Sequence, residues 1–178
     1  AEGRMPRDLY IASTSDGALT KLLSPADLPL NERPQRNDNK LDYGLETRDE
    51  FVRSRENQIG NVEWAPDSKR LIFTFGGDIF ILTIGDSKPK RLTNTQTPEF
   101  GARFLDNERI LFSQSGNAYI LNTTTAELTQ ITREANQQNF ISVGSVTPNK
   151  AGLLIAYTVT DASKQRPLIV PNYLPEFV

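Results

Sequence analysis

Val62–Thr93, VEWAPDSKRLIFTFGGDIFILTIGDSKPKRLT, contains every feature of a small antiparallel sheet. Pro66–Ser68 predicts a turn, because proline presets φ and the two polar side chains can bond nearby backbone amides. Two apolar runs follow, Leu71–Phe75 and Ile79–Thr83, and Gly76–Gly77 between them supplies the positive φ of a tight hairpin. Short apolar runs between turn residues are typical of strands. The stretch predicts a four-stranded meander: short, long, long, short.

Pieces of this unit recur along the chain. Arg70–Thr93 matches Arg109–Thr132 without a gap, at a spacing of 39 residues. Asp8–Leu23 matches the back half of the unit, and Ser145–Val159 matches the front half, with Pro148 placed on Pro66. A period of about 40 residues with four strands per period is typical of a β-propeller blade.

The repeats predict an all-β chain, a partial β-propeller of about three four-stranded antiparallel blades with one short helical insertion. We expect one incomplete propeller domain with these parts: a half blade of two strands and a Pro-rich linker at 1–30, a charged insertion at 31–60, blades at 61–101 and 102–141, and a partial blade at 142–178. In the last part, Thr160–Lys164 is the predicted hairpin turn and Leu168–Val170 the strand that follows it.

The insertion interrupts the repeat. Asn31–Gln58 holds thirteen charged residues in 28, seven acidic and six basic. Thr47 and Glu50 have the spacing of a capping box and predict a short helix. Either this helix is a solvated surface element, or it carries contacts to a partner, as insertions in loops often do.

Composition narrows the function classes. The chain has no histidine and no cysteine, so it cannot by itself assemble a Ser-His-Asp triad, a disulfide or a thiolate metal site. Its formal net charge is −2 with both signs mixed, and no basic stripe suggests nucleic acid. No apolar run approaches the roughly 20 residues of a membrane-spanning helix. No signal peptide opens the sequence. The absence of cysteine fits any compartment and also suits an exported, processed protein.

No residue is predicted to be catalytic or to bind a metal, no cofactor is expected, and the substrate-binding residues are unknown. Asp49-Glu50 is the one carboxylate pair, and neighbours on a helix do not face each other. Asp67-Ser68 and Asp106-Asn107 recur at equivalent turns, which favours turn chemistry. Ser163 and Lys164 do not have the spacing of a Ser-Lys pair, and Gly76-Gly77 lacks the helix of a phosphate loop. Asn122-Thr123-Thr124 is a formal glycosylation sequon.

A chain of about three blades leaves open sheet edges, which pair readily with other strands. Closed propellers typically have 4–8 blades. We therefore expect this chain to be part of a larger protein. An alternative is a small independent domain that forms a homo-oligomer through its open edges.

The repeat resembles the N-terminal propeller of dipeptidyl peptidase IV-type serine peptidases, in the prolyl oligopeptidase clan. Trp64–Arg70, Phe75–Phe80, Arg91–Thr95 and the tail Val170–Leu174 carry the likeness, which covers about 62–178. The resemblance implies a propeller that admits peptide substrates to a C-terminal α/β-hydrolase domain. It also implies export, to the periplasm or outside the cell, with a cytoplasmic location as the alternative.

That hydrolase domain's G-x-S-x-G elbow and histidine are absent here, so the chain alone is predicted to be inactive. Its implied role is to gate peptides and to contact the hydrolase domain or a partner subunit. The W-x-P-D-x-K turn is shared with TolB-like propellers, so the second hypothesis is a protein-binding propeller with no peptidase attached. No functional residue of the family can be carried over by position.

Overall fold

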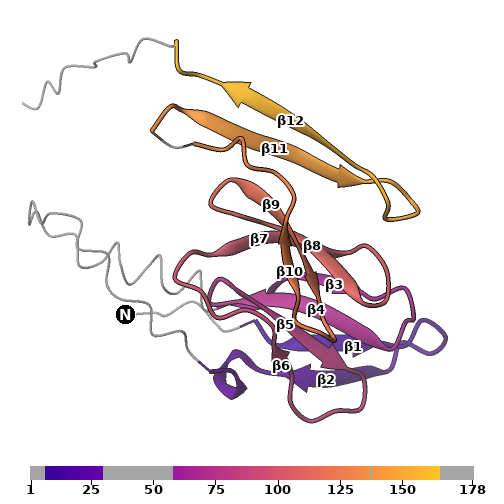
Figure 1. Ribbon diagram of the computed structural model, residues 1–178. Coiled ribbons are helices and arrows are strands. Elements are labelled where there is room, and N and C mark those ends of the chain that lie inside the picture. The colour runs from indigo at the N-terminus through magenta and orange to yellow at the C-terminus, as the bar shows by residue number, and fades with distance from the viewer. Residues whose placement is uncertain (1–6, 30–57, 137, 165–178) are drawn as a thin grey trace, which may run out of the picture.

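The computed structural model describes residues 7–29, 58–136 and 138–164, and the described residues are almost entirely β-structure (Figure 1). One 3₁₀ turn, η1 (Pro25–Asp27), follows the second strand. The strands are β1 (Leu9–Ala12), β2 (Leu19–Leu23), β3 (Gly60–Trp64), β4 (Arg70–Phe75), β5 (Asp78–Thr83), β6 (Lys90–Arg91), β7 (Glu99–Phe104), β8 (Arg109–Gln114), β9 (Asn117–Asn122), β10 (Leu128–Gln130), β11 (Ile141–Pro148) and β12 (Ile155–Asp161).

These strands form four antiparallel sheets that follow one another in chain order (Figure 1). β3–β6 and β7–β10 are complete four-stranded meanders, which we call blade 1 and blade 2. β1–β2 and β11–β12 are two-stranded hairpins. The chain is therefore all-β and forms part of a β-propeller, as the repeats predict.

The turns at the centre of each blade explain why the two sequences fold alike. Gly76 and Gly77 join β4 to β5 with φ of 58° and 79°, and Ser115 and Gly116 join β8 to β9 with φ of 49° and 78°. Two consecutive residues with positive φ make a hairpin turn whose twist matches that of the strands. The long strands then pair in register along their whole length, with Phe73 opposite Phe80 and Phe112 opposite Tyr119.

The first strand of each unit carries a bulge at the same place. The pairing register shifts after Gly60 in β3, after Phe100 in β7 and after Gly144 in β11. The next residue in each case has positive φ: Asn61, Gly101 and Ser145. A bulge bends its strand and sharpens the local twist. The repeat thus extends to a local irregularity that periodicity alone does not reveal.

Blade 1 is buried on both faces, which is why β4 and β5 read as continuous apolar runs rather than alternating ones. Leu71, Phe73, Phe75, Phe80 and Leu82 pack with Leu9 and Leu23 of the β1–β2 hairpin. On the opposite face, Ile72 and Ile79 pack with blade 2 residues that include Ala102, Ile110 and Phe112. Stacked aromatic pairs, Phe73 on Phe80 and Phe112 on Tyr119, reinforce both blades.

The structure corrects two details of the sequence reading. Pro148 is the last residue of β11 and pairs with Ile155, so it stands where Phe104 and Trp64 stand, not where Pro66 does. β12 continues to Asp161, so the expected turn at Thr160–Lys164 begins later than predicted. The predicted helix near Thr47 and the predicted strand Leu168–Val170 lie outside the described residues. The domain bounds given above remain a prediction.

Within the described residues, no helix has the length and apolar character needed to cross a bilayer.

Candidate functional site

A buried ion pair stands at the start of β5. The side chain of Asp78 is 1% exposed and accepts a hydrogen bond from the Arg91 guanidinium on β6. The backbone N–H of Thr95 donates to Asp78 Oδ1 at 3.2 Å. A buried carboxylate is tolerated when a charge and hydrogen bonds neutralise it. This pair attaches the short outer strand to the blade.

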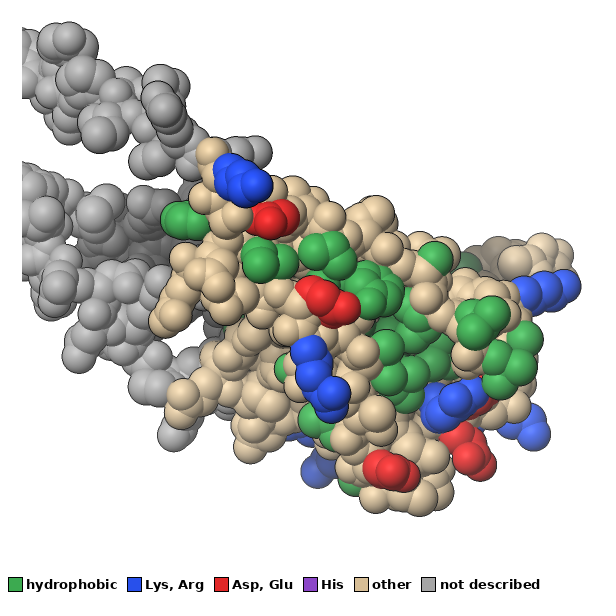
Figure 2. All heavy atoms as spheres, turned by 45° about the horizontal axis from the view of Figure 1, so that its top comes forward, with side chains coloured by type: hydrophobic (Ala, Val, Ile, Leu, Met, Phe, Trp, Pro, Cys, Tyr) green, Lys and Arg blue, Asp and Glu red, His purple; other side chains and the backbone are tan. Residues whose placement is uncertain are grey.

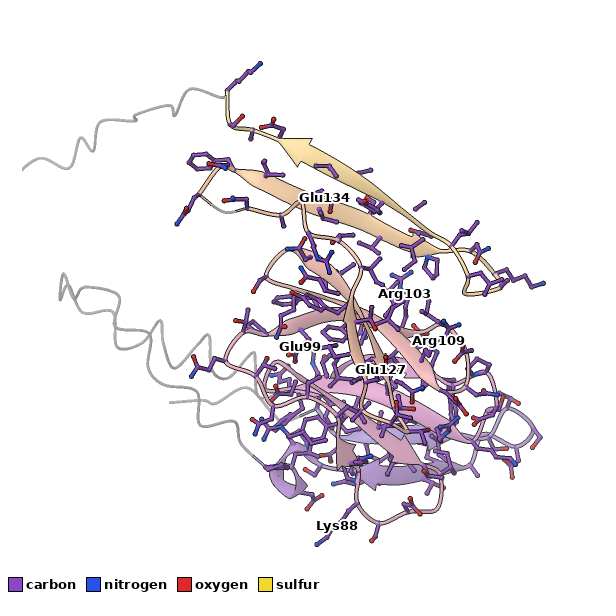
Figure 3. The ribbon with its side chains drawn as sticks, viewed as in Figure 1. Lys88, Glu99, Arg103, Arg109, Glu127 and Glu134 are labelled. Atoms are coloured by element: carbon purple, nitrogen blue, oxygen red, sulfur yellow. The ribbon has the colours of Figure 1, made fainter. Side chains whose placement is uncertain are left out.

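Glu99, at the start of β7, extends this polar cluster to blade 2 (Figure 3). Thr93 Oγ1 accepts from the N–H of Ile79 at 2.8 Å and donates to Glu99 Oε2 at 2.9 Å. Gln114 Nε2 donates to Glu99 Oε1 at 2.8 Å. The cluster therefore connects the end of blade 1 with the first two strands of blade 2.

Blade 2 repeats the arrangement with neutral side chains. Thr132 Oγ1 accepts from the N–H of Ala118 at 2.8 Å and donates to Asn117 Oδ1 at 3.1 Å. Asn117 stands where Asp78 stands in blade 1, and Gln130 stands where Arg91 stands. What recurs is the threonine hydroxyl that accepts from a backbone N–H of the third strand, while the acceptor of its own proton differs: Glu99 in blade 1 and Asn117 in blade 2. This bond is therefore a repeated structural element of the blades.

A second repeated element ties adjacent units together at their turns. Arg70 donates to Asp67 Oδ2 at 2.7 Å and to the carbonyl of Asn107 in blade 2 at 2.6 Å. Arg109 (Figure 3) donates to Asp106 Oδ2 at 2.7 Å and to the carbonyl of Gly152 at 3.3 Å. Each Asp–Arg pair therefore reaches the turn of the next unit. This confirms the expectation that Asp67 and Asp106 serve turns.

We call the pairs Asp67–Arg70 and Asp106–Arg109 the two Asp–Arg clamps. Both aspartates have pKa values below the usual range. For Asp67 the first cause is the hydrogen bond from the N–H of Lys69, and Arg70 adds to it. For Asp106 burial acts in the opposite direction, but hydrogen bonds from the N–H of Glu108 and from Arg109 outweigh it and lower the pKa. Both carboxylates are therefore charged at neutral pH.

A third set of contacts joins the first strands of the two blades. Asn61 Nδ2 donates to the carbonyl of Ala102 at 2.6 Å. Glu63 Oε1 accepts from the N–H of Phe104 at 2.8 Å. These two side chains, together with the apolar cluster between blade 1 and blade 2, close the space between β3 and β7.

The corresponding junction between blade 2 and the β11–β12 hairpin is open. β7, β8 and the bulge of β11 enclose a groove of about 360 Å³. Its polar wall includes Arg103, Ser113, Ser145 and Thr147, and Figure 3 shows Arg103 between blade 2 and the hairpin. In the part of the chain that the structure describes, this groove is the candidate binding site.

The other residues considered from the sequence have structural roles or lie elsewhere. Asn122 Oδ1 accepts from the N–H groups of Thr124 and Thr125 at 2.9 Å, so the side chain of the sequon caps its own turn. Asp161 Oδ1 accepts from the N–H of Ser163 at 2.9 Å, a contact within the turn after β12. Asp49-Glu50 lies outside the described residues. No group of three or more potential metal ligands occurs among the residues that are described.

Arg103 is the site residue that sequence reasoning missed. A signal was present: forty residues separate Glu63 from Arg103 and Asn61 from Gly101, so both bonding side chains of β3 are replaced in β7. Matching the first strands position by position, bulge included, would have identified the exchange. The ungapped match began only at Arg70 and did not include those strands.

Comparison with known proteins adds little to this geometry. No family model matches the chain, and no curated protein matches it. Among solved structures it is similar to TolB from Acinetobacter baumannii, with 16% identity and a TM-score of 0.44, over 88% of this chain and 35% of that one. The chain thus spans about a third of that structure's length.

Proposed function

We propose that this chain is a non-catalytic segment of a β-propeller that binds other protein segments. The observation that carries the proposal is an apolar surface on and around the β11–β12 hairpin. Five large hydrophobic side chains there are exposed: Phe140, Leu153, Leu154, Tyr157 and Val159. Figure 2 shows hydrophobic side chains gathered across this face. Clustered exposed apolar groups of this kind favour contact with protein.

The number of strands in the hairpin sheet explains why this apolar surface is exposed. Tyr157 stands where Phe73 and Phe112 stand in the blades, and Phe73 is 0% exposed whereas Tyr157 is 39% exposed. In the blades, the second strand pairs with a third strand of the same sheet, which also contributes side chains that pack against it. Among the described residues the hairpin has no such third strand, and a bound protein segment would supply the missing packing.

A photo-crosslinker at Leu154 tests this proposal in the full-length protein as its organism makes it. A covalent adduct to a separate polypeptide supports a protein-binding module. Crosslinks only within the same polypeptide, with none to a partner, contradict it, because the surface then packs against the protein's own remaining strands. A crosslinker at Leu128, exposed on β10 of the complete blade 2, is the matched control and is expected to give no adduct.

The second candidate function is a dipeptidyl peptidase IV-like serine peptidase as the parent protein. The W-A-P-D-S-K-R turn at Trp64–Arg70 and the tail at Val170–Leu174 favour it. In that case the chain gates peptides for a hydrolase domain encoded beyond Val178, and the parent is exported. Cleavage of a Pro-containing dipeptide chromogenic substrate by the parent supports this candidate. An inactive, verified full-length parent would contradict it.

A further inference from the structure

The junction between blade 2 and the β11–β12 hairpin differs from the blade 1–blade 2 junction at specific positions. Asn61 and Glu63 of β3 bond to the backbone of β7. Their counterparts in β7 are Gly101, which has no side chain, and Arg103. The strand they face has changed as well, because Pro148 stands in place of Phe104 and has no N–H to donate. A glutamate at position 103 would have no such donor to accept from.

The hairpin contacts blade 2 at its turn and again in the middle of β12, opposite the β11 bulge that lines the groove. At the turn, a Cβ added to Gly152 would lie 2.8 Å from the carbonyl oxygen of Leu105. Away from this turn, the hydroxyl of Tyr157 donates to Glu134 at 2.8 Å, and this bond lowers the pKa of Glu134. These contacts hold the hairpin against blade 2 while the groove stays open.

Arg103 has no charged or hydrogen-bonding partner among the described residues. The side chain is half-buried in the groove, whose lining contains no acidic residue. Two arginines of the neighbouring turns, Arg70 and Arg109, each pair with an aspartate. A guanidinium partly withdrawn from water gains strongly from an anion that reaches it.

The remaining wall supplies neutral donors and open backbone. Ser113, Ser145 and Thr147 line the same groove as Arg103, and the Thr147 hydroxyl donates to the carbonyl of Ser145 at 3.3 Å. Gly101 leaves open space on the same strand as Arg103, because a Cβ built there would meet nothing within 4 Å. The groove therefore combines one positive charge with the hydroxyl-bearing residues Ser113 and Ser145 and an open position at Gly101.

We propose that this groove binds a carboxylate group of a peptide, held by the Arg103 guanidinium. A single monovalent carboxylate balances the single charge and matches the planar fork of arginine. A phosphate dianion would keep an uncompensated charge in a groove that offers one cation. The proposal concerns the groove and is independent of the exposed apolar surface described above.

The test uses the whole 178-residue chain, labelled with ¹⁵N, and three peptides followed by amide chemical shifts. Acetyl-Gly-Asp-Gly-amide carries only a side-chain carboxylate, acetyl-Gly-Ala-Gly carries only a terminal carboxylate, and acetyl-Gly-Asn-Gly-amide is neutral. We expect at least one of the two anionic peptides to saturate and to shift the amides of Gly101, Ser113 and Thr147. Which of them saturates identifies the source of the carboxylate.

Two variants test whether the changes in amide chemical shift depend on the Arg103 guanidinium. Arg103→Gln is expected to weaken binding about tenfold or more, as removal of a charged hydrogen-bond partner does. Arg103→Lys keeps the positive charge but lacks the planar pair of N–H donors, and it is expected to give a smaller loss of affinity. This variant tests the role of Arg103 even if Arg103→Gln folds poorly. Arg133→Gln removes an exposed charge outside the groove lining and is the matched control, with unchanged binding expected.

Three results would overturn the proposal: equal binding of the neutral peptide, tighter binding of inorganic phosphate than of either carboxylate, or full affinity in Arg103→Gln. Failure of both anionic peptides to saturate at millimolar concentration would do the same.

Discussion

The two junctions of blade 2 are built from the same sequence repeat, but the one toward blade 1 is closed and the one toward the β11–β12 hairpin is open. Toward blade 1 the space is filled by an apolar cluster and closed by Asn61 and Glu63. Toward the β11–β12 hairpin the space remains a groove with Arg103 in its wall. The difference shows that side chains on the first strand of a blade, Asn61 and Glu63 in one case and Arg103 in the other, contribute to whether the junction is closed.

The strands available at the two interfaces differ as well. In blade 1, strands β4 and β5 together supply the aromatic and aliphatic groups of both clusters. The hairpin has the counterpart of β4, namely β12, but no counterpart of β5 among the described residues. The side chains that the third strand supplies in blade 1 therefore have no counterpart among the described residues of the hairpin, where several apolar side chains are exposed.

The largest expected effect contrasts Phe73→Ala with Tyr157→Ala at the matching position. Phe73 is fully buried and stacked on Phe80, so its truncation should cost about 4 kcal/mol of unfolding free energy. Tyr157 is exposed, and its truncation should cost less than about 1 kcal/mol. Urea unfolding of both variants measures the difference. Equal losses would mean that the hairpin interface is as well packed as the blade.

A smaller contrast concerns the polar clusters. Arg91→Met removes the charge that faces buried Asp78 and should cost about 3 kcal/mol, because a buried carboxylate then loses its cation. Gln130→Met, at the matching position of blade 2, removes a hydrogen bond to the carbonyl of Thr132 and should cost about 1 kcal/mol. Urea midpoints at neutral pH measure both. A Gln130→Met cost as large as that of Arg91→Met would contradict the assigned role of the charge.

Replacing the two bonding residues of β3 with their counterparts from β7 tests whether these side chains close the junction between blade 1 and blade 2. The double substitution Asn61→Gly with Glu63→Arg removes two contacts to blade 2 and should cost about 2 kcal/mol. The N–H of Phe104 should also lose protection against hydrogen exchange, because Glu63 is its acceptor. Asp86→Asn, an exposed change in the turn after β5, is the control for a general effect. Unchanged protection of Phe104 would show that the apolar cluster alone closes this junction.

Much of the fold could be predicted from sequence because its determinants are local. The positive-φ pair Gly76-Gly77 and the turn around Asp67 mark the strand ends, and the apolar runs between them have the length of strands. Pro148 shows where this fails: the same residue type as Pro66 is the last residue of a strand, in the place of Trp64, although the pairs Trp64–Leu71 and Pro148–Ile155 enclose turns of equal length. One residue type does not determine a register, whereas strand pairing does.

The candidate site could not be predicted in the same way. Arg103 becomes notable only when β7 lies beside β11 and no carboxylate lies near it, and both facts are long-range. Glu99 likewise reads as an ordinary charged residue until Thr93 and Gln114 are brought to it from two other segments. Such residues are found by comparing repeats in the folded register rather than by motif.

The smallest expected effect uses pH to compare the two Asp–Arg clamps. The pKa of Asp67 is lowered on folding, so the carboxylate contributes stability above its unfolded pKa of about 3.9, and this contribution is lost as pH falls through the lower folded value. The urea midpoint should fall between pH 5 and pH 2, and Asp67→Asn should remove part of that fall. Asp106→Asn should remove less, because both carboxylates also bond within their own turns and the clamps differ in what their arginine reaches. Arg109 extends to the hairpin, and we expect this two-stranded unit to open before the blades unfold. Equal effects of the two substitutions would mean that hairpin and blades unfold as one unit, and the groove beside Arg103 would then belong to the cooperative core of the protein.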